Sequence, residues 1–324
     1  MIEPVGTPEE SGPGGLDADQ VVRLRLDISY DGTDFCGWAR QPGLRSVQGE
    51  LEAALRSALR IDPTVPVRVA VAGRTDAGVH ALGQVCHADV PAAAWASSAG
   101  PTGTDSGAQA PSDAVRRRCN GLLGQDIRVR AIEPAPPGFD ARWSASWRRY
   151  LYAVADRPDS QDPVTRGHVL WRTRELDVPA MSAAATPFLG EHDFTAYCRA
   201  RRGASSVRTV HEIRWVRPGP PDSGGDPPAE GPRPARPAAG LPVEFWIRAD
   251  AFCHSMVRSL VGAFLAVGEG RWPVQRPAEL LEAAVRVPSI EAAPAHGLTL
   301  VEVGYPTDQD LHAQAERARR YRGR

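Results

Sequence analysis

A short turn bracketed by glycines, between two segments with strand periodicity, most constrains how this chain folds. Valines occupy every second position from 67 to 71 before the turn, and the segment 85–87 alternates in a similar way after it. Such alternation with a period of two is typical of β-strands. Gly73 and Gly78 allow backbone conformations that would strain larger residues. The sequence therefore predicts a tight turn that projects from a β-sheet.

The turn carries two side chains of opposite charge, Arg74 and Asp76. Thr75, between them, can form a local hydrogen bond and help to hold both in fixed directions. One interpretation is an ordinary polar hairpin with an Arg–Asp ion pair, since surface turns with glycine and aspartate are common. The other is a functional loop in which Asp76 takes part in chemistry. The residues of the turn leave both interpretations open.

Strand and helix patterns alternate through the rest of the chain, with a similar plan in two halves, 21–137 and 138–307. The first half is predicted to contain strands over 22–28 and 127–131, a helix over 47–59 that Ser46 caps, and a helix over 113–123. The second half is predicted to contain strands over 150–154, 210–216 and 243–247 and an apolar helix over 252–267. This order of elements indicates an α+β fold with a duplicated unit around a cleft.

Three stretches rich in proline, glycine, alanine and serine interrupt this plan: 1–20, 91–112 and 217–242. They contain few large apolar groups to bury, so we expect a disordered N-terminal tail and two flexible insertions. The segment 308–324 is a basic tail. It could add RNA contacts, but we favour a disordered end.

The charge balance sets limits on partners. With 324 residues and a formal net charge of −1, the whole chain is not a simple basic nucleic-acid binder. All 38 of its basic lysine-or-arginine positions are arginine, a bias that genome composition explains without any functional meaning. Local clusters can still track a phosphate backbone, and a solvated surface is the alternative for each. The clusters lie at 116–118, at 148 and 149, between 199 and 208, and at 317–324.

The cysteines and histidines suggest neither cross-links nor a metal. The five cysteines are odd in number and scattered without a C-x-x-C pair, which indicates neither a disulfide framework nor a zinc site. The eight histidines have no ligand spacing. No segment has the apolar length of a signal peptide or a membrane span. We therefore expect a soluble protein in the reducing cytoplasm, without a metal.

Several motifs occur in a fixed order along residues 22–306 and carry a family resemblance. They are YDGT at 30–33, FCGW at 35–38, SVQGELEAAL at 46–55, GRTDAGVHA at 73–81, FDAR at 139–142, RYLY at 149–152, AFCHSMVR at 251–258 and GLTL at 297–300. Together they resemble the TruA family of tRNA pseudouridine synthases. The resemblance implies a pseudouridine synthase-like α+β fold, with two related halves whose antiparallel sheets join edge to edge around a central cleft.

The activity that the resemblance implies is the isomerisation of uridine to pseudouridine in the anticodon stem-loop of tRNA, at tRNA positions 38–40. Family members act as homodimers and need no cofactor and no metal. The reaction breaks an N-glycosidic bond, rotates the freed uracil and rejoins it to ribose through carbon. It requires a carboxylate that acts as a nucleophile or as a base, and the sequence does not choose between the two routes.

The resemblance assigns roles to three residues of the reaction. Asp76 matches the essential aspartate, Arg258 matches the basic residue that pairs with it, and Tyr150 matches the tyrosine that stacks on the target base. Each has a plainer alternative, because Asp76 could pair with Arg74, Arg258 with another acid, and Tyr150 could be a core aromatic.

Four further residues match positions that contact the substrate. Arg74 matches the arginine that enters the RNA stem and holds the target nucleotide outside the stack, which offsets part of the cost of extruding a base. Leu298 is expected to pack beneath the base. Arg142 and His254 match positions near the RNA, and we assign both a binding role.

Two other classes of protein remain as alternatives. An RNA-binding module without catalysis would have arginine clusters but no reason to combine Asp76, Tyr150 and Arg258. A glycoside hydrolase usually needs two positioned carboxyl groups, so Asp31 or Asp140 would have to meet Asp76.

Overall fold

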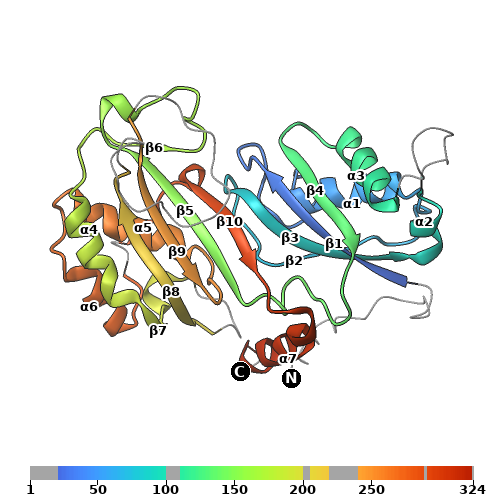
Figure 1. Cartoon of the computed structure of the whole chain (residues 1–324). Coiled ribbons are helices and arrows are strands. Elements are labelled where there is room, and N and C mark those ends of the chain that lie inside the picture. The colour runs from blue at the N-terminus through green and yellow to red at the C-terminus, as the bar shows by residue number, and fades with distance from the viewer. Residues whose placement is uncertain (1–20, 100–109, 200–204, 219–239, 288–289, 323–324) are drawn as a thin grey trace, which may run out of the picture.

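The computed structural model describes residues 21–99, 110–199, 205–218, 240–287 and 290–322. Within these ranges ten strands form one sheet, in the order β4-β1-β3-β10-β5-β9-β8-β7, with β2 paired to β3 and β6 to β5 (Figure 1). Helices accompany this sheet, so the fold is α+β, as predicted. The N-terminal tail predicted over 1–20 lies outside the described residues. None of the described helices has the length and apolar character needed to span a membrane.

The N-terminal part of the sheet follows the predicted pattern. Its strands are β1 (Val21–Tyr30), β2 (Val69–Val71), β3 (His80–Pro91) and β4 (Ile127–Pro134), and its helices are α1 (Val47–Ala58), α2 (Ala92–Ala96) and α3 (Pro111–Leu122). In β1, Leu24, Leu26 and Ile28 are fully buried while the residues between them are half-exposed, as the alternation predicts. Ser46 caps α1 by accepting a hydrogen bond from the Gly49 amide at 3.3 Å.

The C-terminal part contributes the other strands and helices. The strands are β5 (Trp147–Ala155), β6 (Leu170–Trp171), β7 (Gly190–Asp193), β8 (Val207–Val216), β9 (Val243–Ala249) and β10 (Leu298–Gly304), and the helices are α4 (Val178–Ala185), α5 (Met256–Gly268) and α6 (Arg276–Ala283). Helix α5 begins four residues later than predicted, because Ser255 adopts a left-handed conformation with φ of 61°. Its apolar side chains, including Leu260, Val261 and Phe264, are fully buried.

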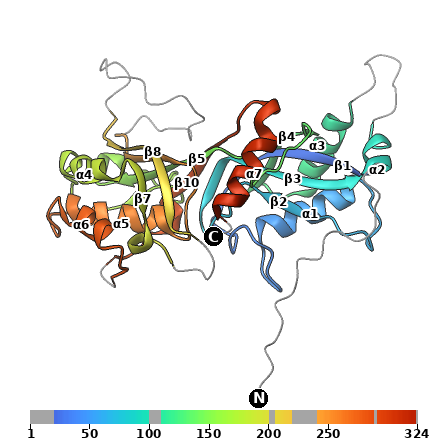
Figure 2. The ribbon, with the colours of Figure 1, turned by 90° about the horizontal axis from the view of Figure 1, so that it is seen from below.

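Strand β10 joins the two parts of the sheet. It runs antiparallel to β5 and parallel to β3, where Thr299 lies opposite His80. The two parts of the sheet lie side by side and meet edge to edge as expected (Figure 2). The strands that join them, β3 and β10, are parallel. This pairing brings the turn between β2 and β3 close to the segment that leads into α5.

Both predicted insertions contain ordered residues at their edges. Within 91–112, Ala92–Ala96 forms α2 and Pro111 begins α3, while 100–109 lies outside the described residues. Within 217–242, the Arg217 guanidinium pairs with the Asp156 carboxylate at 2.6 Å, and 219–239 lies outside the described residues. Buried Asp156 needs a cation as partner, which explains why Arg217 is part of the folded structure.

The basic C-terminal segment is helical, which corrects the expectation of a disordered end. Helix α7 spans Leu311–Arg322 and lies below the junction of the two parts in Figure 1. Leu311 and Ala315, four residues apart, are both buried, and Arg319 pairs with Asp140 at 3.6 Å. The prediction gave weight to the arginines and overlooked this small apolar face.

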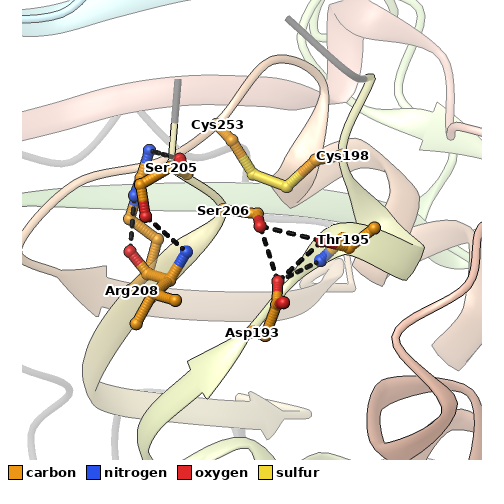
Figure 3. The surroundings of a disulfide bond; sticks show 8 residues. Asp193, Thr195, Cys198, Ser205, Ser206, Arg208 and Cys253 are labelled. Atoms are coloured by element: carbon orange, nitrogen blue, oxygen red, sulfur yellow. Dashed lines mark hydrogen bonds between the residues drawn. A yellow bond between two sulfur atoms is a disulfide. The ribbon is translucent and has the colours of Figure 1, made fainter. Parts of the chain in front are cut away.

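Cys198 and Cys253 form a disulfide, contrary to the prediction from the cysteine pattern (Figure 3). The two cysteines are 55 residues apart, and their Cα atoms lie 5.7 Å from each other. Next to the bond, the Arg199 amide donates to the His254 carbonyl at 3.0 Å. The sequence spacing gave no sign of this pair, because the fold alone brings the two segments together.

Candidate active site

Asp76 lies in the loop of residues 72–79 between β2 and β3, which we call the aspartate loop. The Asp76 carbonyl accepts a hydrogen bond from the Val79 amide at 3.2 Å. Gly78 has φ of +77°, a conformation that favours glycine. The Asp76 side chain retains 29% of its exposure, so it is anchored by its backbone and open to a substrate.

Two buried polar side chains, Tyr30 and Gln84, form hydrogen bonds with the aspartate loop. The Tyr30 hydroxyl lies 2.8 Å from the Thr75 hydroxyl, and the Gln84 amide nitrogen donates to the Tyr30 hydroxyl at 3.2 Å and to the Gly73 carbonyl at 2.8 Å. Burial raises the pKa of Tyr30 to about 12, so this hydroxyl stays protonated at neutral pH. The loop therefore rests on a connected hydrogen-bond network.

The FCGW segment, residues 35–38, also contacts the aspartate loop. The Trp38 amide donates to the Thr75 carbonyl at 3.1 Å. Gly37 has φ of +90°, and a Cβ atom there would lie only 3.0 Å from the same carbonyl oxygen. A side chain at this position would push the aspartate loop away.

The partners of Asp76 come from residues 251–258, which we call the arginine segment. The Arg258 Nη1 atom lies 3.3 Å from Asp76 Oδ2, as does the Ser255 hydroxyl, and His254 Nε2 lies 3.5 Å from Oδ1. Arg258 is also tied to Ala293, since its Nε donates to the Ala293 carbonyl at 2.7 Å. The structure thus brings together Asp76, Arg258 and His254 from the two halves of the chain.

Tyr150 lies on β5, is buried and interacts electrostatically with Asp76. Its ring meets Phe252 edge to face, with 5.0 Å between the ring centres. Burial raises the pKa of Tyr150 far above its usual value; the Asp76 charge adds to this effect, and the Arg148 charge opposes it. The phenol is therefore a neutral hydrogen-bonding and stacking group. Tyr152, on the same face of β5, is fully buried and donates to the Pro294 carbonyl at 2.9 Å.

Leu298 begins β10 opposite Tyr152 and is buried. The preceding Gly297 has no room for a side chain, because a Cβ atom would lie 2.5 Å from the Tyr152 ring. The His296 carbonyl accepts a hydrogen bond from His80 Nε2 at 3.0 Å. Leu298 is thus held in place by tight packing on one side and by β10 pairing on the other.

Arg74 and Arg142 are exposed. Arg74 has no hydrogen bond or ion pair with any residue in the part of the chain that the structure describes, so the simple Arg74–Asp76 pair is not formed. The Arg142 guanidinium lies over the Trp143 ring, 4.4 Å from its centre. Neither contacts Asp76.

Some arginine clusters do not form surfaces for RNA. Arg148, Arg149 and Arg208 are buried, with 3%, 9% and 7% of their surface exposed. They are part of the folded interior, so neither alternative for these clusters, a phosphate-tracking surface or a solvated one, applies to these three arginines. The side chain of Arg117 on α3 is exposed, as is that of Arg199.

Asp31 and Asp140, the two candidates for the second carboxylate of a glycoside hydrolase, do not contact Asp76. Asp31 accepts hydrogen bonds from Thr33 and lies 3.0 Å from His80 Nδ1. Asp140 accepts from the amides of Arg142 and Trp143 at 2.8 and 2.9 Å. Each belongs to a separate cluster, which argues against a two-carboxylate site at Asp76.

One group of side chains in the described residues has the composition of a metal site: Asp31, His80 and His168. However, His80 Nδ1 accepts a hydrogen bond from the Gly32 amide at 2.9 Å, and its Nε2 is bonded to the His296 carbonyl. Neither ring nitrogen has a free lone pair for a metal ion. His80 instead connects the segment before Leu298 to the YDGT turn.

Sequence reasoning did not assign several residues that support the site. Tyr30 and Gln84 are polar groups at buried positions of β1 and β3, and Ser255 contacts Asp76 directly. A signal was present for Tyr30, which continues the buried alternation of β1 and places a hydroxyl inside the sheet. A buried hydroxyl requires a partner, and Thr75 is that partner.

Comparisons with known proteins agree with this arrangement. A family model described as "tRNA pseudouridine synthase" matches residues 28–143 and 184–306. The chain is 50% identical over 301 residues to tRNA pseudouridine synthase A of Streptomyces griseus subsp. griseus, covering 93% of this chain and 94% of the relative. It is 49% identical over 304 residues to tRNA pseudouridine synthase A of Frankia casuarinae, covering 94% and 97%. With the protein of the same name from Leifsonia xyli subsp. xyli, identity is 47% over 306 residues, covering 93% and 98%.

Proposed function

The chain belongs to the tRNA pseudouridine synthase family, and we propose that it isomerises uridines in the anticodon stem-loop of tRNA with Asp76 as its essential carboxylate. The observation that carries this proposal is the contact between Asp76 and Arg258, from segments 182 residues apart, together with the electrostatic interaction between Asp76 and Tyr150. A plain surface hairpin would not require this convergence.

The reaction needs no external reactant. The bond between N1 of uracil and C1′ of ribose breaks, a bond between C5 and C1′ forms, the C5 proton leaves and N1 gains a proton, so the atoms balance. Asp76 acts either by attacking the sugar or by removing a proton and returning one. Arg258 and Ser255 both contact Oδ2 and so fix the orientation of the carboxylate for either route.

Neighbouring side chains suit a flipped base. In this proposal the Tyr150 ring stacks on the uracil, and Leu298 packs beneath it. Arg74, which has no partner among the described residues, is free to enter the stem in place of the extruded nucleotide. A guanidinium there can also touch phosphate, which offsets part of the cost of unstacking.

The proposed substrate is recognised by shape and phosphate positions more than by base identity. Family membership leads us to propose tRNA positions 38–40, where one enzyme must accept different neighbouring bases. Exposed Arg74, Arg142 and His254 flank the aspartate loop or the arginine segment and are suited to backbone contacts, which fix register without reading sequence.

We further propose that the protein works as a homodimer in the cytoplasm. Mass determination by light scattering tests the dimer. The disulfide bears on location, because persistent disulfides are rare in reducing compartments. Alkylation of thiols in freshly lysed cells tests whether Cys198 and Cys253 are oxidised there.

The decisive experiment for Asp76 is nucleoside analysis of an unmodified tRNA transcript after incubation with the protein. We expect pseudouridine from the parent and none from a folded Asp76→Asn variant. Asp62→Asn is the matched control, because this aspartate lies in an exposed turn where it accepts from Thr64. Tight binding of several tRNAs by the parent without any product would instead favour the binding-module alternative. Product from Asp76→Asn would remove Asp76 as the catalyst.

A further inference from the structure

Arg148 on β5 is buried, yet its guanidinium donates four hydrogen bonds to backbone carbonyls. Nη1 donates to Asp250 at 2.8 Å and to Ala145 at 3.3 Å, and Nη2 donates to Ala72 at 2.7 Å and to Arg142 at 3.0 Å. Only 3% of its surface is exposed. All four Nη hydrogens of the side chain thus donate hydrogen bonds, and the acceptor carbonyls come from three separate segments of the chain.

These carbonyls belong to the segments that carry the proposed site. Ala72 is the first residue of the aspartate loop, and Asp250 immediately precedes the arginine segment. Arg142 is the last residue of the FDAR motif, and Ala145 lies between this motif and β5. Arg148 itself shares a face of β5 with Tyr150, because the two are separated by one residue.

Only a guanidinium can make this set of contacts. A lysine ammonium has one nitrogen and three donors, so it cannot reach four oxygens in a planar fork. An apolar residue would leave four carbonyl oxygens without donors inside the protein. Burial lowers the pKa of Arg148, and the charge of the nearby Asp250 side chain opposes this effect without outweighing it.

We propose that Arg148 is a positioning residue of the isomerisation, which holds the aspartate loop and the arginine segment at the separation where Asp76 meets Arg258. It does not touch the substrate, and the proposal rests on the proposed function of Asp76. Displacing one segment relative to the other would separate the carboxylate from its partners, which need a fixed distance, whereas the long exposed side chains proposed to contact RNA could still reach phosphates. Arg148 therefore affects the chemical step more than tRNA binding.

The test compares Arg148→Lys with Arg149→Lys in single-turnover kinetics and in tRNA binding. Arg149 is the matched control, because it points to the other face of β5 and pairs with Glu302 at 3.2 Å and Glu212 at 3.7 Å. We expect Arg148→Lys to lower the single-turnover rate about 100-fold, as small misplacements in active sites do. Its Kd for tRNA should stay within about threefold of the parent, as should both constants of Arg149→Lys.

Rates are normalised to the folded fraction, measured by circular dichroism on the same samples. A parent-like normalised rate for folded Arg148→Lys overturns the proposal, and so does an equal loss of rate and of tRNA binding. If Arg148→Lys does not fold, Arg148→Gln takes its place, because a neutral amide brings no buried charge and still supplies two donors. A parent that makes no pseudouridine, or an active Asp76→Asn, rejects the proposed function instead, which separates the two failures.

Discussion

The aspartate loop and the arginine segment each supply one side of the same ion pair, but they are held in different ways. The aspartate loop rests on buried polar side chains, with Tyr30 and Gln84 bonded to Thr75 and Gly73. The arginine segment is held by a covalent bond, the Cys198–Cys253 disulfide, and by backbone contacts. The aspartate loop thus depends on the hydrogen bonds of particular side chains. The arginine segment depends on the oxidation state of two cysteines.

This difference predicts which substitutions should lower activity and which should lower stability. The Asp76–Arg258 pair is partly exposed, with 29% and 21% of the two side chains accessible, so the pair itself adds little to stability. Its main effect is on geometry at the site. Changes at the pair should therefore lower activity, and changes at the two supports should mainly lower stability.

The largest effect is expected from Arg258→Met, which removes the guanidinium between the two segments. We expect the rate of pseudouridine formation to fall about 100-fold, because Asp76 loses the contact that fixes its Oδ2 atom. The free energy of unfolding should fall by only about 1–2 kcal/mol, mostly from the unpaired Ala293 carbonyl. Arg271→Met is the control, since exposed Arg271 pairs with Glu269 beyond the C-terminal end of α5, whereas Arg258 lies in its first turn. Activity within threefold of the parent would contradict the role of Arg258.

Breaking the disulfide comes next. Replacing Cys198 and Cys253 together by serine should lower the free energy of unfolding by about 2–4 kcal/mol without reductant, because the bond closes a loop of 55 residues. Exposed Cys36→Ser should leave stability unchanged. Mass spectrometry after alkylation should find three free thiols in the parent without reductant, Cys36, Cys86 and Cys119, and five with it. Five free thiols in both samples would show that the cross-link is absent in solution.

Tyr30→Phe tests the hydrogen-bonded support. Thr75 and Gln84 would lose a buried partner, and we expect a loss of about 1–2 kcal/mol in urea unfolding together with lower activity. Tyr197→Phe is matched, since its buried hydroxyl donates to the Pro277 carbonyl at 2.7 Å. Its loss of stability should be similar, with no loss of activity. Equal activity in both variants would mean that the Tyr30 network does not position Asp76.

The regular elements were predictable because their signals are local. The period of two in β1 and the four-residue spacing of Val47, Leu51 and Leu55 in α1 need no knowledge of the rest of the chain. The late start of α5 was not predictable from its apolar run, because a single left-handed residue, Ser255, delays the helix. The parallel pairing of β10 with β3 likewise depends on the complete fold.

For the site, family resemblance located Asp76, Tyr150 and Arg258, while the physical reasoning on the turn left Asp76 ambiguous. The residues that position these side chains, such as Tyr30 and Arg148, were missed, because a tyrosine or an arginine within a strand pattern cannot be distinguished from any other strand residue. Arg148 was counted with an exposed arginine cluster, and only the fold shows that its guanidinium faces four carbonyls. Long-range contacts of this kind leave no periodic trace in a sequence.

The smallest expected effect is a pH dependence of stability that comes from His80. His80 follows the aspartate loop directly, and burial lowers its pKa below 6.5; nearby His168 acts in the same direction, and Asp31 opposes it without outweighing it. The unfolded chain therefore binds more protons than the folded one as the pH falls below about 6.5. Stability should decline there, by at most about 1.4 kcal/mol per pH unit for this group.

His80→Asn should flatten part of that decline, because asparagine can accept the Gly32 hydrogen bond without titrating. Exposed His211→Asn should not change the slope. Part of the decline is expected to remain because of His87, whose pKa is lowered by burial and by Arg23 against the opposing charges of Asp140 and Asp89.

Repeating the pH series on the variant that lacks Cys198 and Cys253 tests whether the disulfide and His80 act independently. If the free energy of unfolding is lower but changes with pH at the same slope, the two act independently. A changed slope means that loss of the disulfide alters the surroundings of His80.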